Sequence, residues 1–238
     1  MRQLGETVSY AGRGIHKVAV EALAKRIFDG TYGEGDTLAL PDLMRELQVS
    51  QTVLREAIKV LSTKGLLDAR QKRGTFVRPQ EEWNLLDTDV LRWKLAAGAS
   101  SDFFADLLEL RRSIEPAAAA LAAERRTDDD LAALDAALSA MAATDRDPVM
   151  LVRADASFHS AILVASNNRF YAQMHRVIVP VIVRRRDRAV REGGAGAYEY
   201  EHPHAAHAKV VDAIRDGDAD GAYVLMLELL DLSARDHS

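Results

Sequence analysis

The chain has 238 residues, 48% hydrophobic and 28% charged, with a formal net charge of -5 and no cysteine. Disulfides, thiolate metal sites and a cysteine nucleophile are therefore excluded, and no apolar stretch approaches the ~20 residues of a membrane span. The N-terminal residues lack the apolar core of a signal peptide. We expect a cytoplasmic protein of one large or two smaller domains, beginning with a disordered tail over residues 1–12.

The charge is distributed unevenly between the two ends of the chain. Residues 1–79 hold 13 Lys and Arg against 9 Asp and Glu, whereas the remainder holds 18 against 27. A basic front half and an acidic back half are typical of a DNA-facing module attached to a part that does not touch phosphate. Chance clustering on a solvated surface is the alternative interpretation of this difference.

The first 79 residues predict three helices and a hairpin. Apolar residues recur at helical spacing between residues 15 and 27. A short helix is expected over residues 41–47, because its first residue is a proline and proline is tolerated in a first helical turn. Ser50 is the expected N-cap of the third helix, and Gly65 stands at its C-cap. The segment LLDARQKRGTFV then predicts two short strands around a basic turn.

Beyond residue 80 the pattern is helical throughout. The segment WNLLDTDVLRWKLAAG predicts a connecting helix within residues 80–100, and residues 101–238 predict an all-α antiparallel helical bundle. The alanine-rich stretches of this part indicate close packing between helices. The expected helices of the bundle cover residues 102–124, 128–143, 148–166, 169–192, 198–216 and 219–235.

Three helices followed by a hairpin describe a winged helix-turn-helix, here over residues 13–79. The second helix of the pair enters the major groove, where glutamine pairs with adenine and arginine with guanine. The glycine of the hairpin lets the backbone approach DNA closely, and the two cations of the turn would lie beside phosphate. A solvated helix face and an ordinary hairpin turn are the alternatives for each feature taken singly. The candidate DNA-binding residues are Ser50, Gln51, Thr52, Arg55, Lys59, Lys72, Arg73, Gly74 and Thr75.

The stretch GDTLALPDLMRELQVSQTVLREAIKVLSTKGLLDARQKRGTFV resembles the N-terminal domain of the GntR family of regulators. The agreement is specific in VSQTVLREAIKVLSTKGLL and in RGTFV. Arg55 and Gly74 match the family pattern. Gln51 stands where the family usually has arginine, and Pro41 lies in the region that often supplies another arginine. The family's operator sequence therefore does not transfer to this chain.

The back half resembles the FadR-like branch of that family, whose helical effector domain is called FCD. The matching stretches are DLLELRRSIEPAAAALAAERRT, RADASFHSAILVASNN and HAKVVDAIRDGDADGAY. The segment EEWNLLDTDVLRWKL also resembles the corresponding stretch of repressors of galactonate catabolism. The resemblance implies a small carboxylate effector, with a sugar acid favoured.

The candidate effector residues are Arg111, Asp155, His159 and His207. Asp155 and His159 stand four residues apart, on one face of one helix, where a carboxylate and an imidazole can share a cation or a ligand. Arg111 could clamp a carboxylate through its planar fork. Taken alone, such an acid–histidine pair is more often surface electrostatics. The family resemblance implies a divalent metal such as zinc on Asp155, His159 and His207, with Leu229 in the place of a further histidine.

We expect a ligand-responsive DNA-binding regulator, a homodimer on near-palindromic double-stranded operator DNA, with no membrane partner and no enzymatic activity. The alternative is an all-helical metal-dependent enzyme using Asp155, His159 and His207. That alternative leaves the basic hairpin unexplained, and the chain has no H-E-x-x-H motif or glycine-rich phosphate loop. A helical scaffold module without ligand is a third interpretation, but it does not explain the acid, arginine and histidine set.

Overall fold

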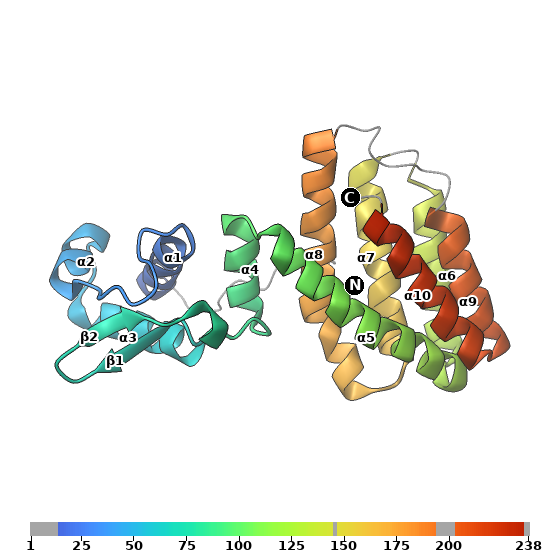
Figure 1. The fold of residues 1–238 in the computed structure, drawn as a ribbon, viewed down its shortest axis with the longest axis horizontal. Helices are drawn as coiled ribbons and strands as arrows, with labels where there is room; N and C mark the ends of the chain where they lie inside the picture. Colours follow the sequence, from blue (N-terminus) through green and yellow to red (C-terminus); the bar gives the residue numbers. More distant parts are fainter. Residues whose placement is uncertain (1–13, 145–146, 194–202, 236–238) are drawn as a thin grey trace. The chain divides into compact units, whose positions relative to one another are not determined.

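The computed structural model describes residues 14–144, 147–193 and 203–235, and the tail expected over residues 1–12 lies outside them. The chain divides after Ala99 into two compact units (Figure 1). Within the described ranges, no helix is both long enough and apolar enough to cross a bilayer.

The N-terminal unit begins with three helices, as the apolar spacing predicts. Helix α2 carries its proline in the first turn, and Ser50 caps α3 by accepting a hydrogen bond from the backbone N–H of Val53 at 3.3 Å. Gly65 follows the end of α3 with a φ of 80°, a conformation that favours glycine. The bounds are Ile15–Phe28 for α1, Leu40–Leu47 for α2 and Gln51–Thr63 for α3.

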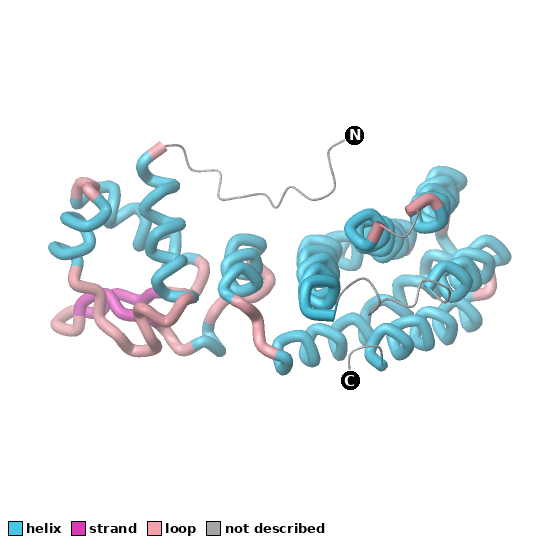
Figure 2. The backbone as a smooth tube through the Cα atoms, turned by 90° about the horizontal axis from the view of Figure 1, so that it is seen from above, coloured by secondary structure: helices cyan, strands magenta, loops and turns pink. Residues whose placement is uncertain are grey.

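The hairpin consists of β1 (Leu67–Arg70) and β2 (Gly74–Val77), which pair in antiparallel register from Leu67↔Val77 to Arg70↔Gly74. The turn places Lys72 at a φ of 69° and Gly74 at 83°. These are the only strands in the part of the chain that the structure describes, and Figure 2 shows them in magenta. The sequence predicted this single hairpin correctly.

A short 3₁₀ turn (Gln80–Glu82) and helix α4 (Thr88–Ala97) complete the N-terminal unit. Trp83, Val90 and Trp93 lie in the same buried core as the first three helices. Helix α4 ends at Gly98, which has a φ of 95°. The expected connecting helix is thus an integral, packed part of the N-terminal unit.

The second unit is a bundle of helices around a core rich in alanine (Figure 1). Helix α7 packs against α5, α6 and α8, and α9 packs against α5, α6 and α10. Four alanines of α5 are fully buried, so the alanine-rich stretches serve close helix packing, as predicted. The bounds are Ser101–Arg125 for α5, Asp128–Ala142 for α6, Pro148–Ala165 for α7, Arg169–Gly193 for α8, Pro203–Asp216 for α9 and Ala219–Arg235 for α10.

The mainly α fold, with a winged helix-turn-helix and a helical bundle, agrees with the sequence expectation. Most helix ends lie within one or two residues of their predicted positions, since caps and turn residues mark them locally. The helix expected from residue 198 is described only from Pro203, because residues 198–202 lie outside the described ranges.

Candidate functional site

Helix α3 presents a polar face to solvent. Gln51, Thr52, Arg55 and Lys59 are exposed, while the opposite side of the helix packs into the core of the unit. Lys59 forms an ion pair with Glu56 at 2.6 Å, and Arg55 has no hydrogen-bond or ion-pair partner among the described residues. An exposed arginine with unused donors is available for a base edge or a phosphate.

The hairpin places its two cations differently. Lys72 is exposed in the turn, whereas the guanidinium carbon of Arg73 lies 3.6 Å from the centre of the Phe76 ring. This stacking holds Arg73 against its own strand. Thr75 is buried, and its carbonyl accepts a hydrogen bond from Leu38 at 2.8 Å, so its side chain offers little surface to a partner.

The helical unit brings five polar side chains together in its interior. They come from three helices, and each of the five residues is at most 4% exposed. We call this group the His159 cluster: Arg111 and Glu115 on α5, Asp155 and His159 on α7, and His207 on α9. All four effector candidates from the sequence are in it.

Glu115 is the member that sequence reasoning missed. Its two oxygens accept from Arg111 Nε at 2.6 Å and from His159 Nδ1 at 2.5 Å. The available signal was its position four residues after Arg111, which places both side chains on one face of α5. Glutamate is usually exposed, so from the sequence alone a glutamate on an alanine-rich helix is expected to face solvent.

The ring nitrogens of the cluster converge on Asp155. Its Oδ1 lies 3.0 Å from His207 Nε2 and 3.7 Å from His159 Nε2. Each of these three residues offers one atom that could ligate a metal ion, and the three atoms lie within 4.8 Å of one another. The ring of Phe158 packs edge-on against both imidazoles, with centroid distances of 5.3 Å to His159 and 4.6 Å to His207.

Arg111 lies against the His159 ring. Its terminal nitrogen is 3.3 Å from Nδ1 and 3.1 Å from Nε2. Because Nδ1 donates its proton to Glu115, Nε2 is the only ring nitrogen that can accept from this N–H, and it can do so only while His159 is neutral.

The neighbours of Glu115 and His159 favour the charged form of both side chains. Burial raises the pKa of Glu115, but the charges of Arg111 and His159 and their hydrogen bonds outweigh this effect and lower the pKa to about 2. Burial and Arg111 lower the pKa of His159, yet Glu115 and Asp155 together hold it above its ordinary value. Glu115 is therefore ionised at neutral pH, and it stabilises both Arg111 and a protonated His159.

The donor set fits a divalent cation. Two imidazoles and one carboxylate are common ligands of zinc, and three protein ligands leave a position for water or another molecule. Glu115 engages Nδ1 of His159, so Nε2 is the nitrogen left to face Asp155 and His207, as in many carboxylate-supported metal sites.

Within the described ranges, neither the residue expected as a further ligand nor His175 or His204 adds an imidazole to Asp155, His159 and His207. Leu229 is buried in the apolar core of the bundle. His204 is exposed at the start of α9, and His175 contacts the carbonyl of Ala172 on its own helix.

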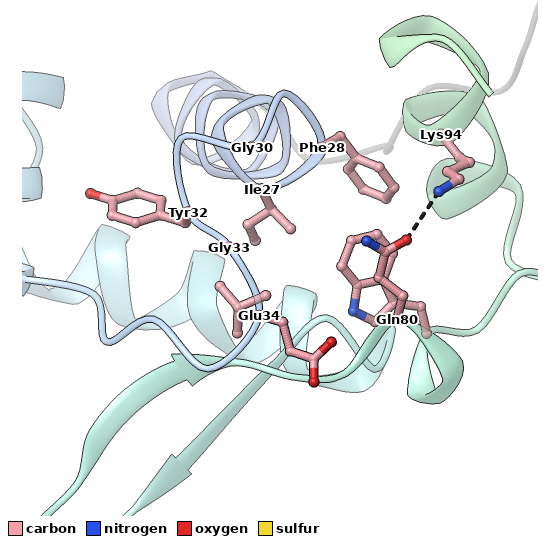
Figure 3. Close-up of a pocket in the computed structure, with 10 residues that line it drawn as sticks. Ile27, Phe28, Gly30, Tyr32, Gly33, Glu34, Gln80 and Lys94 are labelled. Atoms are coloured by element: carbon pink, nitrogen blue, oxygen red, sulfur yellow. Dashed lines mark hydrogen bonds between the residues drawn. The ribbon is translucent and has the colours of Figure 1, made fainter. Parts of the chain in front are cut away.

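A pocket of about 130 Å³ lies in the N-terminal unit, bounded by Phe28, Tyr32, Trp83 and Lys94 among others (Figure 3). None of the cluster residues lines it. Its volume is below the roughly 300 Å³ at which small-molecule sites begin, so we do not take it as the effector site.

Family comparisons match both halves of the chain. The model "Bacterial regulatory proteins, gntR family" matches residues 16–77, and the FCD domain matches residues 106–232. The chain is 35% identical over 219 residues to the galactonate operon transcriptional repressor of Escherichia coli K12, covering 91% of this chain and 93% of that protein. It is 32% identical over 189 residues to a putative L-lactate dehydrogenase operon regulatory protein of the same organism, covering 78% and 71%.

Solved structures agree with this match. A GntR protein of Streptococcus agalactiae is similar with a TM-score of 0.51 and 26% identity, over 92% of this chain and 99% of that one. The structure of Lar, described as controlling expression of the Listeria monocytogenes agr system, has a TM-score of 0.62 over 95% and 98%. At 18% identity, that second likeness shows the fold alone.

Proposed function

The chain belongs to the GntR family of bacterial regulatory proteins and carries an FCD domain, and we propose that it is a repressor of a catabolic operon that responds to a small carboxylate. A sugar acid is the favoured effector, because a relative named as the galactonate operon repressor aligns along most of both chains. The observation that carries the proposal is the His159 cluster, a set of charged and imidazole groups closed inside an otherwise apolar bundle.

On the DNA side, we assign base reading to the exposed face of α3. Arg55 is exposed, and its planar guanidinium suits a two-point contact with guanine; Gln51 and Thr52 stand at the helix start, where base edges are met. Lys72 supplies a phosphate contact from the wing. Two copies on a near-palindromic operator satisfy the symmetry of the duplex.

On the effector side, we assign carboxylate binding to Arg111. Its Nε is engaged by Glu115, while its terminal nitrogen faces the imidazole of His159. An incoming carboxylate can pair with that end of the guanidinium without separating Arg111 from Glu115. Asp155 and the two histidines would hold a divalent cation, which would supply a second positive charge for the ligand's oxygens.

Leu229 bears on the strength of such metal binding. With three protein ligands instead of four, the affinity for metal is expected to be weaker and to rise when the effector completes the coordination. We assign the cluster a binding role and no catalytic step, and we place the protein in the cytoplasm with its DNA.

A thermal-shift screen tests this proposal. Galactonate, other sugar acids and small organic acids are added to the full chain, once with zinc and once with a chelator. A hit raises the melting temperature and changes affinity for a DNA duplex that the wild-type protein enriches from a random library. His159→Ala and Arg111→Ala should each lose the response.

His204→Ala is the matched control, because this exposed histidine lies on the same helix as His207. If His159→Ala and Arg111→Ala both keep the full response, the effector binds elsewhere and the assignment is wrong. If the metal is dispensable but His159→Ala still loses the response, the cluster binds its ligand directly.

A further inference from the structure

The N-terminal unit contains a second group of charged side chains that neither base reading nor effector binding uses. We call it the Lys64 cluster: Glu21 on α1, Lys64 at the end of α3, Asp87 before α4, and Asp89 and Arg92 on α4. All five belong to one compact unit, and together they join three of its helices.

Lys64 is the centre of this group. It is the C-cap residue of α3, and its Nζ lies 2.8 Å from both oxygens of Asp87 and 2.9 Å from Asp89 Oδ2. Its side chain is only 12% exposed. Burial lowers its pKa, but the two carboxylates raise it above the ordinary value, so the ammonium is charged and fully engaged.

The network continues from α4 to α1. Asp89 contacts Arg92 at 3.3 Å, and the Arg92 guanidinium reaches the two oxygens of Glu21 at 2.6 and 3.2 Å. The indole N–H of Trp93 donates to Glu21 at 2.7 Å. Helix α4 is thus attached to α1 and to the end of α3 by charged hydrogen bonds, which are stronger than neutral ones.

The backbone tightens the same junction. The N–H of Asn84 donates to the carbonyl of Lys64 at 3.1 Å, and the N–H of Arg78 donates to Leu66 at 3.0 Å. A Cβ on Gly65 would lie 2.4 Å from the carbonyl oxygen of Glu82, so only glycine permits this approach. The segment before α4 therefore crosses directly over the end of the reading helix.

Helix α4 is also the element through which the bundle is attached to this unit. Gly98 ends α4, and Ser100 is already the N-cap of α5, with only Ala99 between them.

We propose that Lys64 is a positioning residue for DNA reading: it clamps α3 to α4 and does not contact DNA. The proposal rests on the proposed function, since it takes α3 as the reading helix. Base edges must be met at a defined angle, whereas phosphate contacts tolerate small rotations. Loosening the clamp should therefore lower sequence discrimination more than it lowers general affinity for DNA.

A lysine at the end of a reading helix is ordinarily interpreted as a phosphate contact. Here three carboxylate oxygens within 2.9 Å occupy the ammonium, and little of the side chain reaches solvent. Lys59 on the same helix is the contrasting case, because its side chain is 71% exposed and pairs only with Glu56.

The test compares Lys64→Met with Lys59→Met in the full-length chain. Affinity is measured for the duplex that wild type enriches from a random library and for a shuffled duplex, over a range of salt concentrations. Lys64→Met should reduce the ratio of the two affinities about tenfold, as for loss of one good base contact, with an unchanged salt slope. Lys59→Met, if it loses a phosphate contact, should lower the slope by about 0.9 and keep the ratio.

Two further variants keep the test decisive if Lys64→Met folds poorly. Lys64→Arg keeps the charge and should retain most of the discrimination. Asp89→Asn removes the negative charge of one of the two carboxylates that hold Lys64, so it should lower the ratio of the two affinities less than Lys64→Met does. Amide exchange should increase together at the end of α3 and the start of α4 in both weakened variants.

A lower salt slope with an unchanged ratio in Lys64→Met would show a phosphate contact and overturn the proposal. An unchanged slope and ratio in folded Lys64→Met and Asp89→Asn would overturn it as well. Failure of the wild-type chain to enrich any duplex would instead count against the proposed function, so the two failures are distinct.

Discussion

Each of the two units contains a cluster of charged side chains, and the clusters differ in whether their cationic groups can lose a proton near neutral pH. In the Lys64 cluster the cations are a lysine and an arginine, which stay protonated and bond directly to carboxylates. In the His159 cluster two of the groups are imidazoles, which can give up a proton and bind a metal or ligand instead. Our assignment of ligand binding to the His159 cluster therefore depends on its two imidazoles and not on buried charge alone.

Removing a carboxylate from each cluster should produce the largest effect and the clearest contrast. Glu115 is fully buried between Arg111 and His159, so Glu115→Ala should cost about 3–5 kcal/mol of stability in the helical unit. The Glu21 side chain is 30% exposed, so water replaces part of its lost interaction, and Glu21→Ala should cost about 1 kcal/mol.

Two probes separate these effects. Both tryptophans lie in the N-terminal unit, so their fluorescence follows that unit, while far-UV circular dichroism follows the helices of both. Glu115→Ala should move the dichroism transition and leave the fluorescence transition in place. Equal costs for the two substitutions would remove the distinction between the clusters.

Zinc should stabilise one cluster and leave the other unchanged. At 100 times its dissociation constant, a ligand that binds only the folded state adds about 2.7 kcal/mol. We expect the dichroism transition of the wild type to rise with zinc and fall with a chelator, while the fluorescence transition stays constant. His207→Ala should abolish the rise and His204→Ala should keep it; an equal rise in both variants would contradict the assignment of the site.

Substituting an exposed cation of the N-terminal unit should weaken DNA binding without affecting stability, unlike substituting a buried one. Arg55→Ala should weaken binding to the enriched duplex by about 1–3 kcal/mol and leave folding intact. Arg55→Lys is the matched variant, since it keeps the charge and loses the planar fork. A lysine that restores full specific affinity would indicate a phosphate contact at this position in place of a base contact.

The wing should show the smallest effect. Lys72→Ala should lower the salt slope by about 0.9, because Lys72 is exposed in the turn. Arg73 is stacked on Phe76, so Arg73→Ala should lower the slope less. The double variant should lower the slope by less than two full phosphate contacts would. A larger slope change from Arg73 than from Lys72 would show that the stack opens on DNA.

The sequence by itself determined the local features of this protein. Apolar spacing, prolines in first turns, Ser50 as a cap and Gly65 after α3 are decided by neighbours in the chain, so the helices and the single hairpin were predictable. The four-residue spacing of Asp155 and His159 likewise placed them on one helix face. The pattern of three helices and a hairpin predicted the reading helix, and the family resemblance added the metal on Asp155, His159 and His207 and the sugar-acid effector.

Only the tertiary structure decided how charges from different helices meet. Glu115 became part of the His159 cluster because α5 packs against α7, and Lys64 meets two carboxylates because the segment before α4 crosses the end of α3. Arg73 was drawn onto Phe76 by the fold of the wing. A charged side chain looks the same in sequence whether it faces water or a partner, and only the packing of distant segments determines which of the two it meets.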